Sequence, residues 1–210
     1  MSSIILYNYE LDDSCYRVRL ALSMLKIPHE TRAVDMVPGN EQKQPAMLAL
    51  NPQGAVPILT DGPLTLYGTE AILAYLAKAY DASGTWLPAD PAAFGRVMQW
   101  LVFSAGTLPA AIEARKVALF GLAGNEHALR AESRSAFRIM DDHMTLRQLD
   151  GHEWFAGDGP TLADLTLFPI FALSRDFGID HDEFPGLRRW IRRFRAIPGF
   201  RTMPGIPDYH

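Results

Sequence analysis

NPQGAVPILTDGPLTLYGTEAILAYL, residues 51–76, is the stretch that decides the fold. Asp61-Gly62-Pro63 is a turn signal between two short apolar runs, so the pattern predicts a pair of antiparallel strands. Apolar residues then recur at helical spacing after Gly68. This predicts a helix whose N-terminal cap is the hydroxyl of Thr69. The stretch therefore predicts turn, strand, turn, strand and helix in succession.

Pro57 follows Val56 inside the first of these strands, where a trans proline would remove a hydrogen bond of the sheet. Because X-Pro is the usual place for cis peptides, we expect a cis Val56-Pro57 bond that turns the N–H and C=O of Val56 outward. Such a pair can hold an extended, peptide-like ligand in the manner of an added strand. The helix start near Thr69 suits a carboxylate. These residues predict a site for a small peptide with a free carboxylate.

NPQGAVPIL followed by LYGTEAILAYL resembles the glutathione-binding half of the cytosolic glutathione transferase family. The resemblance extends over nearly the whole chain and points to a Ser/Cys-type, bacterial-like member. It implies glutathione as co-substrate, a small hydrophobic electrophile as second substrate, a homodimer and a role in detoxification. The chain departs from the family pattern at two positions. Gly68 replaces the usual Glu, Asp or Gln, and Asp12 stands where Ser-type members have their serine.

The order of elements predicts two domains. A strand over 4–9, a helix over 14–26 and a strand over 30–34 form a right-handed parallel crossover, and a short helix and residues 51–76 complete the order βαβαββα of a thioredoxin-like fold. Residues 81–89 have the composition of a linker, and helical patterns follow them. We predict an α/β plus all-α protein: a thioredoxin-like, glutathione-binding domain over 1–80 and an all-helical glutathione transferase C-terminal domain over 90–210.

Two helix patterns stand out in the second half. Thr161 and Asp164 have the spacing of a capping box ahead of a helix that is apolar on nearly every side, which predicts a buried helix that nucleates the core. Residues 187–195 read LRRWIRRFR. Their apolar positions fall at i, i+3, i+4 and i+7, so we interpret the arginines as the solvated face of an amphipathic helix.

Composition excludes several classes of protein. Hydrophobic residues make up 48% of the chain and the net charge is −4, shared by both halves, so no part is a basic nucleic-acid module. A single cysteine excludes an internal disulfide and fits a reducing compartment. No signal peptide and no apolar run long enough for a membrane span is visible. We therefore expect a cytoplasmic protein with no membrane or nucleic-acid partner and no metal.

A glutathione enzyme must favour the thiolate of a thiol whose ordinary pKa is roughly 8.5. The candidates lie in the segment YNYELDDSCY, residues 7–16. Cys15, in the first turn of a helix, can form a mixed disulfide with glutathione or simply pack in the core. Ser14 can donate its hydroxyl to the sulfur or cap the helix. Tyr7 or Tyr9 can donate a phenol hydroxyl, and strand tyrosines more often serve packing.

The resemblance also implies contacts to the rest of glutathione. Val56, next to Pro57, pairs with the cysteinyl backbone, and Thr69 with the following helix start holds the γ-glutamyl carboxylate. Gln42 matches a position that contacts the glycyl carboxylate, or it is a solvated loop residue. Because Gly68 has no side chain to meet the γ-glutamyl ammonium, the adjacent carboxylate for that group is Glu70. Conjugation of glutathione to an electrophile is the predicted activity. The alternatives are a glutathione-dependent disulfide reductase or peroxidase, and a binding protein of the same fold without turnover.

Overall fold

The structure is a computed structural model that describes residues 4–206. The chain forms two compact units, Met1–Ala82 and Ser83–His210, and the division falls inside the predicted linker. Residues 1–3 and 207–210, at the outer ends of the two predicted domains, lie outside the described residues. Within the described part, no helix is both long and apolar enough to cross a membrane.

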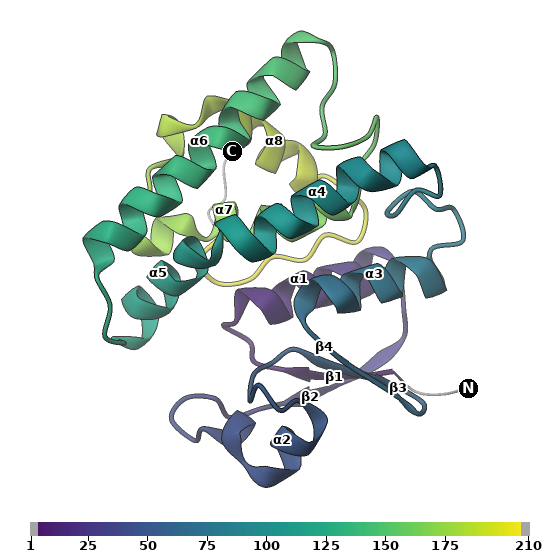
Figure 1. The fold of residues 1–210 in the computed structure, drawn as a ribbon, viewed down its shortest axis with the longest axis vertical. Coiled ribbons are helices and arrows are strands. Elements are labelled where there is room, and N and C mark those ends of the chain that lie inside the picture. The colour runs from purple at the N-terminus through teal and green to yellow at the C-terminus, as the bar shows by residue number, and fades with distance from the viewer. Residues whose placement is uncertain (1–3, 207–210) are drawn as a thin grey trace. The chain divides into compact units, whose positions relative to one another are not determined.

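The N-terminal unit is a four-stranded sheet with helices on both faces. Its strand order is β2-β1-β3-β4, in which β1 and β2 are parallel and the other two pairs are antiparallel. Helices α1 and α3 cover one face and α2 lies against the other (Figure 1). The elements of this unit are β1 (Ile4–Asn8), α1 (Asp13–Met24), β2 (His29–Ala33), the one-turn helix η1 (Glu41–Lys43), α2 (Pro45–Leu50), β3 (Ile58–Asp61), β4 (Leu64–Tyr67) and α3 (Thr69–Tyr80).

The hairpin and the proline predicted from residues 51–76 are confirmed. Asp61 pairs with Leu64 across the turn, where Gly62 has a φ of 57°. The Val56-Pro57 peptide bond is cis and lies just before β3. The register of β1 with β3 then places Ile58 opposite Tyr7. The thioredoxin-like architecture of this unit is therefore confirmed.

The predicted cap of α3 is wrong. The N-cap residue is Gly68, with φ 85° and ψ 117°, and Thr69 is the first residue of the helix itself. A φ of this sign strains residues with a Cβ, which is why a glycine stands at the turn from β4 into α3. Since glycine has no side chain, no side-chain hydrogen bond caps this helix.

The C-terminal unit is helical, as predicted. Residues 91–120 form two helices that are divided at Leu108, because Pro109 begins a new helix. Helix α7 has every residue buried, and its Thr161–Asp164 capping box is formed. The elements are α4 (Pro91–Thr107), α5 (Pro109–Phe120), α6 (Glu126–Leu149), α7 (Leu162–Ala172), the short helices η2 (Ser174–Phe177) and η3 (His181–Glu183), and α8 (Pro185–Arg195).

The arginine-rich segment forms α8, and its amphipathic pattern is confirmed. Leu187, Trp190, Ile191 and Phe194 are all buried. The Trp190 indole N–H donates to the Oδ1 of Asp164 at 3.0 Å, which joins α8 to the start of α7. The arginines therefore belong to the outer face of a core helix.

Candidate functional site

The start of α1 lies at the end of β1, where the sequence placed its candidate thiolate partners. Asp12 is the N-cap, and its Oδ1 accepts a hydrogen bond from the main-chain N–H of Cys15 at 2.7 Å. The interpretation of Ser14 as the cap is therefore wrong. Because the Asp12 carboxylate is 7% exposed and already occupies the positive end of α1, that helix end is not open to a second anion.

Cys15 is fully buried. It packs in a core cluster with Val34, Met47, Val56 and Ile58, and its Sγ accepts a hydrogen bond from the main-chain N–H of Tyr9 at 3.4 Å. Burial, reinforced by the nearby Asp12 carboxylate, raises the pKa of the Cys15 thiol well above its ordinary value. A thiol that is neutral and enclosed is a poor nucleophile, and these surroundings suit a packing residue.

Tyr7 is the fourth residue of β1, and its hydroxyl accepts a hydrogen bond from Nη1 of Arg32 at 3.3 Å. Its side chain lines a cavity of about 580 Å³ between the sheet and α2, with Met47 and Leu50 among the apolar walls. None of the predicted glutathione contacts lines this cavity. Tyr7 also packs against the core cluster that contains Cys15 and Val56.

Arg17 is the residue that sequence reasoning missed. Its guanidinium, 2% exposed, donates from Nη2 to the Oγ of Ser14 at 2.9 Å and from Nη1 to Oε1 of Glu70 at 2.9 Å. The Asp13 carboxylate lies 3.7 Å from the same guanidinium. A buried cation requires partners of this kind. Arg17 thus joins the first turn of α1 to the first turn of α3 and brings Ser14 close to Glu70.

The start of α3 is open to an anion in a way that the start of α1 is not. Its N-cap, Gly68, contributes no side chain. Thr69, at the first position of the helix, is 6% exposed, and the first main-chain bond of the helix runs from the N–H of Ile72 to the C=O of Gly68 at 3.0 Å. The N–H groups of a first helical turn and the helix dipole together favour a carboxylate.

Two further predicted contacts have distinct surroundings. In the described part of the chain, neither the N–H nor the C=O of Val56 forms a hydrogen bond, so both main-chain groups remain for a ligand. Gln42 in η1 is 7% exposed, and its buried Oε1 has no hydrogen-bond partner among the described residues. The prediction that Gln42 is a solvated loop residue is therefore wrong.

Among residues 4–206, no group of three or more His, Cys, Asp or Glu side chains is arranged to hold a metal ion.

Comparison with protein families gives two matches along the chain. Residues 6–84 match the glutathione S-transferase N-terminal domain, and residues 123–198 match the glutathione S-transferase C-terminal domain. The first match extends two residues beyond the N-terminal unit, and the second lies inside the C-terminal unit.

Individual relatives agree with these matches over most of the chain. Maleylacetoacetate isomerase of Pseudomonas aeruginosa is 31% identical, with 93% of each chain covered. Glutathione S-transferase D7 of Drosophila melanogaster is 26% identical over 95% of this chain and 88% of its own. The crystal structure of a glutathione S-transferase from Pseudomonas fluorescens superposes with a TM-score of 0.86 at 26% identity, covering 97% of this chain and all (100%) of the other. The chain therefore belongs to the glutathione S-transferase family of enzymes.

Proposed function

We propose that this protein binds glutathione on its N-terminal unit and conjugates the thiol to a small hydrophobic electrophile. The observation that carries the proposal is the open start of α3 beside the Ser14–Arg17–Glu70 cluster. This arrangement puts an anion site, a hydroxyl and a carboxylate next to one another. A structure of a glutathione transferase homologue from Drosophila mojavensis, which contains bound glutathione, has a TM-score of 0.84 and is 25% identical.

Glutathione would lie along the end of the sheet. The γ-glutamyl carboxylate accepts hydrogen bonds at the start of α3 and from Thr69, and its ammonium group pairs with Glu70, which Arg17 holds in place. The cysteinyl backbone pairs with the N–H and C=O of Val56 as an added strand does. Gln42 donates to the glycyl carboxylate.

Ser14 is the residue we assign to the thiolate. Its Oγ accepts from Arg17, so its own proton is left to donate, and a neighbouring cation makes a hydroxyl a better donor. That hydrogen bond lowers the pKa of the glutathione thiol, whose proton passes to solvent. The sulfur lone pair then forms a bond to the electrophilic carbon, and the leaving group departs with the electrons of the broken bond.

Calorimetry with glutathione and a conjugation assay with chlorodinitrobenzene test the proposal together. Ser14→Ala is expected to lower turnover about 10²-fold, since a thiolate-stabilising hydrogen bond contributes roughly 2–4 kcal/mol in this kind of site. Glutathione affinity should stay within about threefold. Ser83→Ala is the matched control, because Ser83 is exposed, is not assigned to glutathione and does not line the cavity beside Ile139. Equal turnover in Ser14→Ala and the wild type would contradict the assignment.

Isomerisation is a second candidate function, favoured by the relatives named maleylacetoacetate isomerase, at 31% identity in Pseudomonas aeruginosa and 30% in Vibrio cholerae. Here the glutathione sulfur adds to a cis double bond, the adduct rotates, and elimination returns the trans product and free glutathione. Conversion of a cis-enedione without consumption of glutathione would identify this reaction. Reduction of disulfides is less well supported, since it would need the enclosed thiol of Cys15.

We also infer a homodimer in the cytoplasm that needs no metal. The side chains of Val102 on α4 and Ile139 on α6 are 66% and 53% exposed. Ile139 borders a cavity of about 490 Å³ that residues of both helices line. A second copy of the chain would cover this apolar face. A monomer in light scattering, or turnover that is lost on treatment with a chelator, would contradict these inferences.

A further inference from the structure

Strand β2 forms an open edge of the sheet in the N-terminal unit. It pairs with β1 on one side, and no strand of the described chain lies on its other side. All five residues of β2, His29–Ala33, are exposed. An uncovered edge of this kind presents main-chain N–H and C=O groups to a further strand. The sequence of β2 then determines which strand can pair with it.

Alternate residues of β2 present their main chain to this edge. The N–H of Val34 donates to the C=O of Asn8 at 2.9 Å, and Asn8 is paired with Ala33 in the parallel register. Even-numbered residues therefore bond to β1, and the N–H and C=O groups of His29, Thr31 and Ala33 point away from it. Within residues 4–206, no other group bonds to the outward main chain of Thr31 and Ala33.

The side chains of β2 carry opposite charges two positions apart. Nε of Arg32 lies 3.0 Å from Oε1 of Glu30, so the two side chains share one face of the strand. They are 51% and 52% exposed, respectively. Charged side chains on an edge strand discourage pairing with strands that do not match them. A strand that does match these charges is a second copy of β2 itself.

The sequence of β2, HETRA, is complementary to itself when two copies run antiparallel about Thr31. In that register Thr31 lies opposite Thr31 of the second copy, and each Glu30 lies opposite an Arg32. His29 and Ala33 likewise face each other. The residues with outward main chain then form the hydrogen-bonded pairs. The charged residues form the non-hydrogen-bonded pairs, in which side chains lie closer together.

The charges also select this register over its neighbours. A shift of two residues in either direction keeps the outward main-chain groups facing one another. One such shift places Glu30 opposite Glu30, and the other places Arg32 opposite Arg32. Like charges directly opposite each other destabilise a strand pair. The pairing centred on Thr31 is therefore the one in which main-chain bonds and charges agree.

We propose that β2 pairs with β2 of a second copy of this chain, antiparallel and about a two-fold axis at Thr31. Such a contact is isologous, so each favourable pair occurs twice. Glu30 and Arg32 of the two copies form a row of alternating charges, and two four-stranded sheets become continuous. This interface is distinct from the apolar face of α4 and α6, and it does not depend on glutathione.

Hydrogen exchange of the full chain, followed by NMR, tests the pairing. Each copy contributes one short strand, so we expect weak association that is populated at high protein concentration. The amides of Thr31 and Ala33 should exchange freely at micromolar concentration and more slowly at millimolar concentration. The apolar face of α4 and α6 does not include these amides, so a dimer formed through that face alone would leave their exchange unchanged.

Charge reversal provides a sharper test. Arg32→Glu turns both cross-strand pairs from attractive to repulsive and should raise the dissociation constant about tenfold, as should Glu30→Arg. The double variant Glu30→Arg/Arg32→Glu has opposite charges in every pair and should regain the affinity of the wild type. In an equal mixture of the two single variants, unlike chains have opposite charges in every pair. The mixture should therefore associate more tightly than either variant alone.

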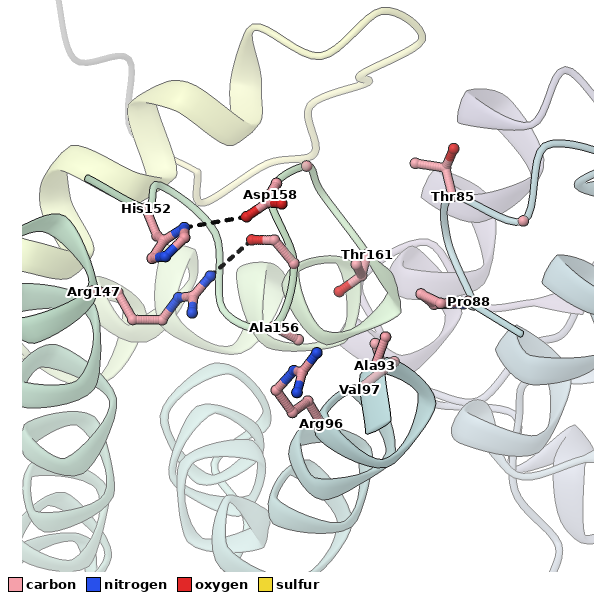
Figure 2. Close-up of a pocket in the computed structure, with 13 residues that line it drawn as sticks. Thr85, Pro88, Ala93, Arg96, Val97, Arg147, His152, Ala156, Asp158 and Thr161 are labelled. Carbon is pink, nitrogen blue, oxygen red and sulfur yellow. Dashed lines mark hydrogen bonds and ion pairs between the residues drawn. The ribbon is translucent and has the colours of Figure 1, made fainter. Parts of the chain in front are cut away.

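Arg96→Glu is the matched control, because it changes the net charge by the same amount. Arg96 is exposed on α4 and borders a cavity of about 500 Å³ in the C-terminal unit (Figure 2). Its self-association should equal that of the wild type. Three outcomes would overturn the proposal: amide exchange at Thr31 and Ala33 that is independent of concentration, equal association of Arg32→Glu and the wild type, or a mixture of single variants that associates no better than each alone.

Discussion

Replacement of Gly68 by alanine should destabilise the protein through the backbone alone. Gly68 has a φ of 85°, which costs a residue with a Cβ about 1–3 kcal/mol. A Cβ built at this position meets no atom within 4 Å, so no clash adds to that cost. Alanine also restricts the unfolded chain, which offsets about 0.4–1 kcal/mol. We expect a net loss of about 1–2 kcal/mol in the free energy of unfolding.

Gly95→Ala provides the matched control. Gly95 lies inside α4, and a Cβ there also meets nothing within 4 Å, but its φ is not positive. Alanine is favoured over glycine in a helix by about 1 kcal/mol. The two variants add the same methyl group to equally open space, so their stability should change in opposite directions.

Thermal unfolding of both variants measures the effect. For a chain of this size, each kcal/mol moves the Tm by about 2–4 °C. The Tm of Gly68→Ala should therefore fall by about 2–8 °C, and that of Gly95→Ala should rise by about 2–4 °C. An unchanged or raised Tm in Gly68→Ala would refute the reasoning.

Gly68→Gln separates the side chain from the strain. It has the same backbone cost as Gly68→Ala and restores a polar group of the kind that the family pattern has ahead of Thr69. Calorimetry should show glutathione binding about three- to tenfold tighter in Gly68→Gln than in Gly68→Ala, as expected for one hydrogen bond. Equal affinities would mean that this position does not reach the ligand.

Three further variants test other parts of the structure. Cys15→Ala should lower the free energy of unfolding by about 1 kcal/mol, because a buried sulfur is lost. The rate of conjugation should stay within about twofold of the wild type. Loss of conjugation would mean that the Cys15 thiol takes part in the reaction. Arg17→Met should weaken glutathione binding at least about tenfold, because Ser14 and Glu70 lose the guanidinium that holds them in place. Calorimetry measures the affinity, and circular dichroism checks that the secondary structure is unchanged. Unaltered affinity would exclude a role of Arg17 in positioning Ser14 and Glu70. Burial raises the pKa of Asp164 from 3.8 to about 6, so the folded state binds the proton more tightly. The stability that this proton contributes is complete below about pH 3.8 and falls by about 3 kcal/mol as the pH rises to 6. Urea unfolding from pH 4 to 7 should show this fall in the wild type and not in Asp164→Asn. If the unfolding free energies of the two proteins change with pH in parallel, the raised pKa of Asp164 is contradicted.

Local patterns in the sequence were sufficient for most of the fold. The hairpin at Asp61-Gly62-Pro63, the capping box at Thr161 and Asp164, and the apolar face of α8 each depend on residues within a few positions of one another. Turn chemistry, capping and helical periodicity act over that range. The resemblance to the glutathione transferase family rested on residues 51–76, and the family matches confirm it.

The tertiary structure alone decided how the candidate site is assembled. Arg17 meets Glu70 across 53 positions of sequence, and no local pattern records which distant carboxylate a buried cation will find. Tertiary packing likewise decided that the thiol of Cys15 is enclosed, because the residues around it, from Val34 to Ile58, are distant from it in the sequence. Gly68, rather than Thr69, became the cap because the turn out of β4 requires a positive φ. The sequence by itself predicted a peptide-like ligand beside Val56 and the start of α3, and three-dimensional packing determined which side chains meet around those residues.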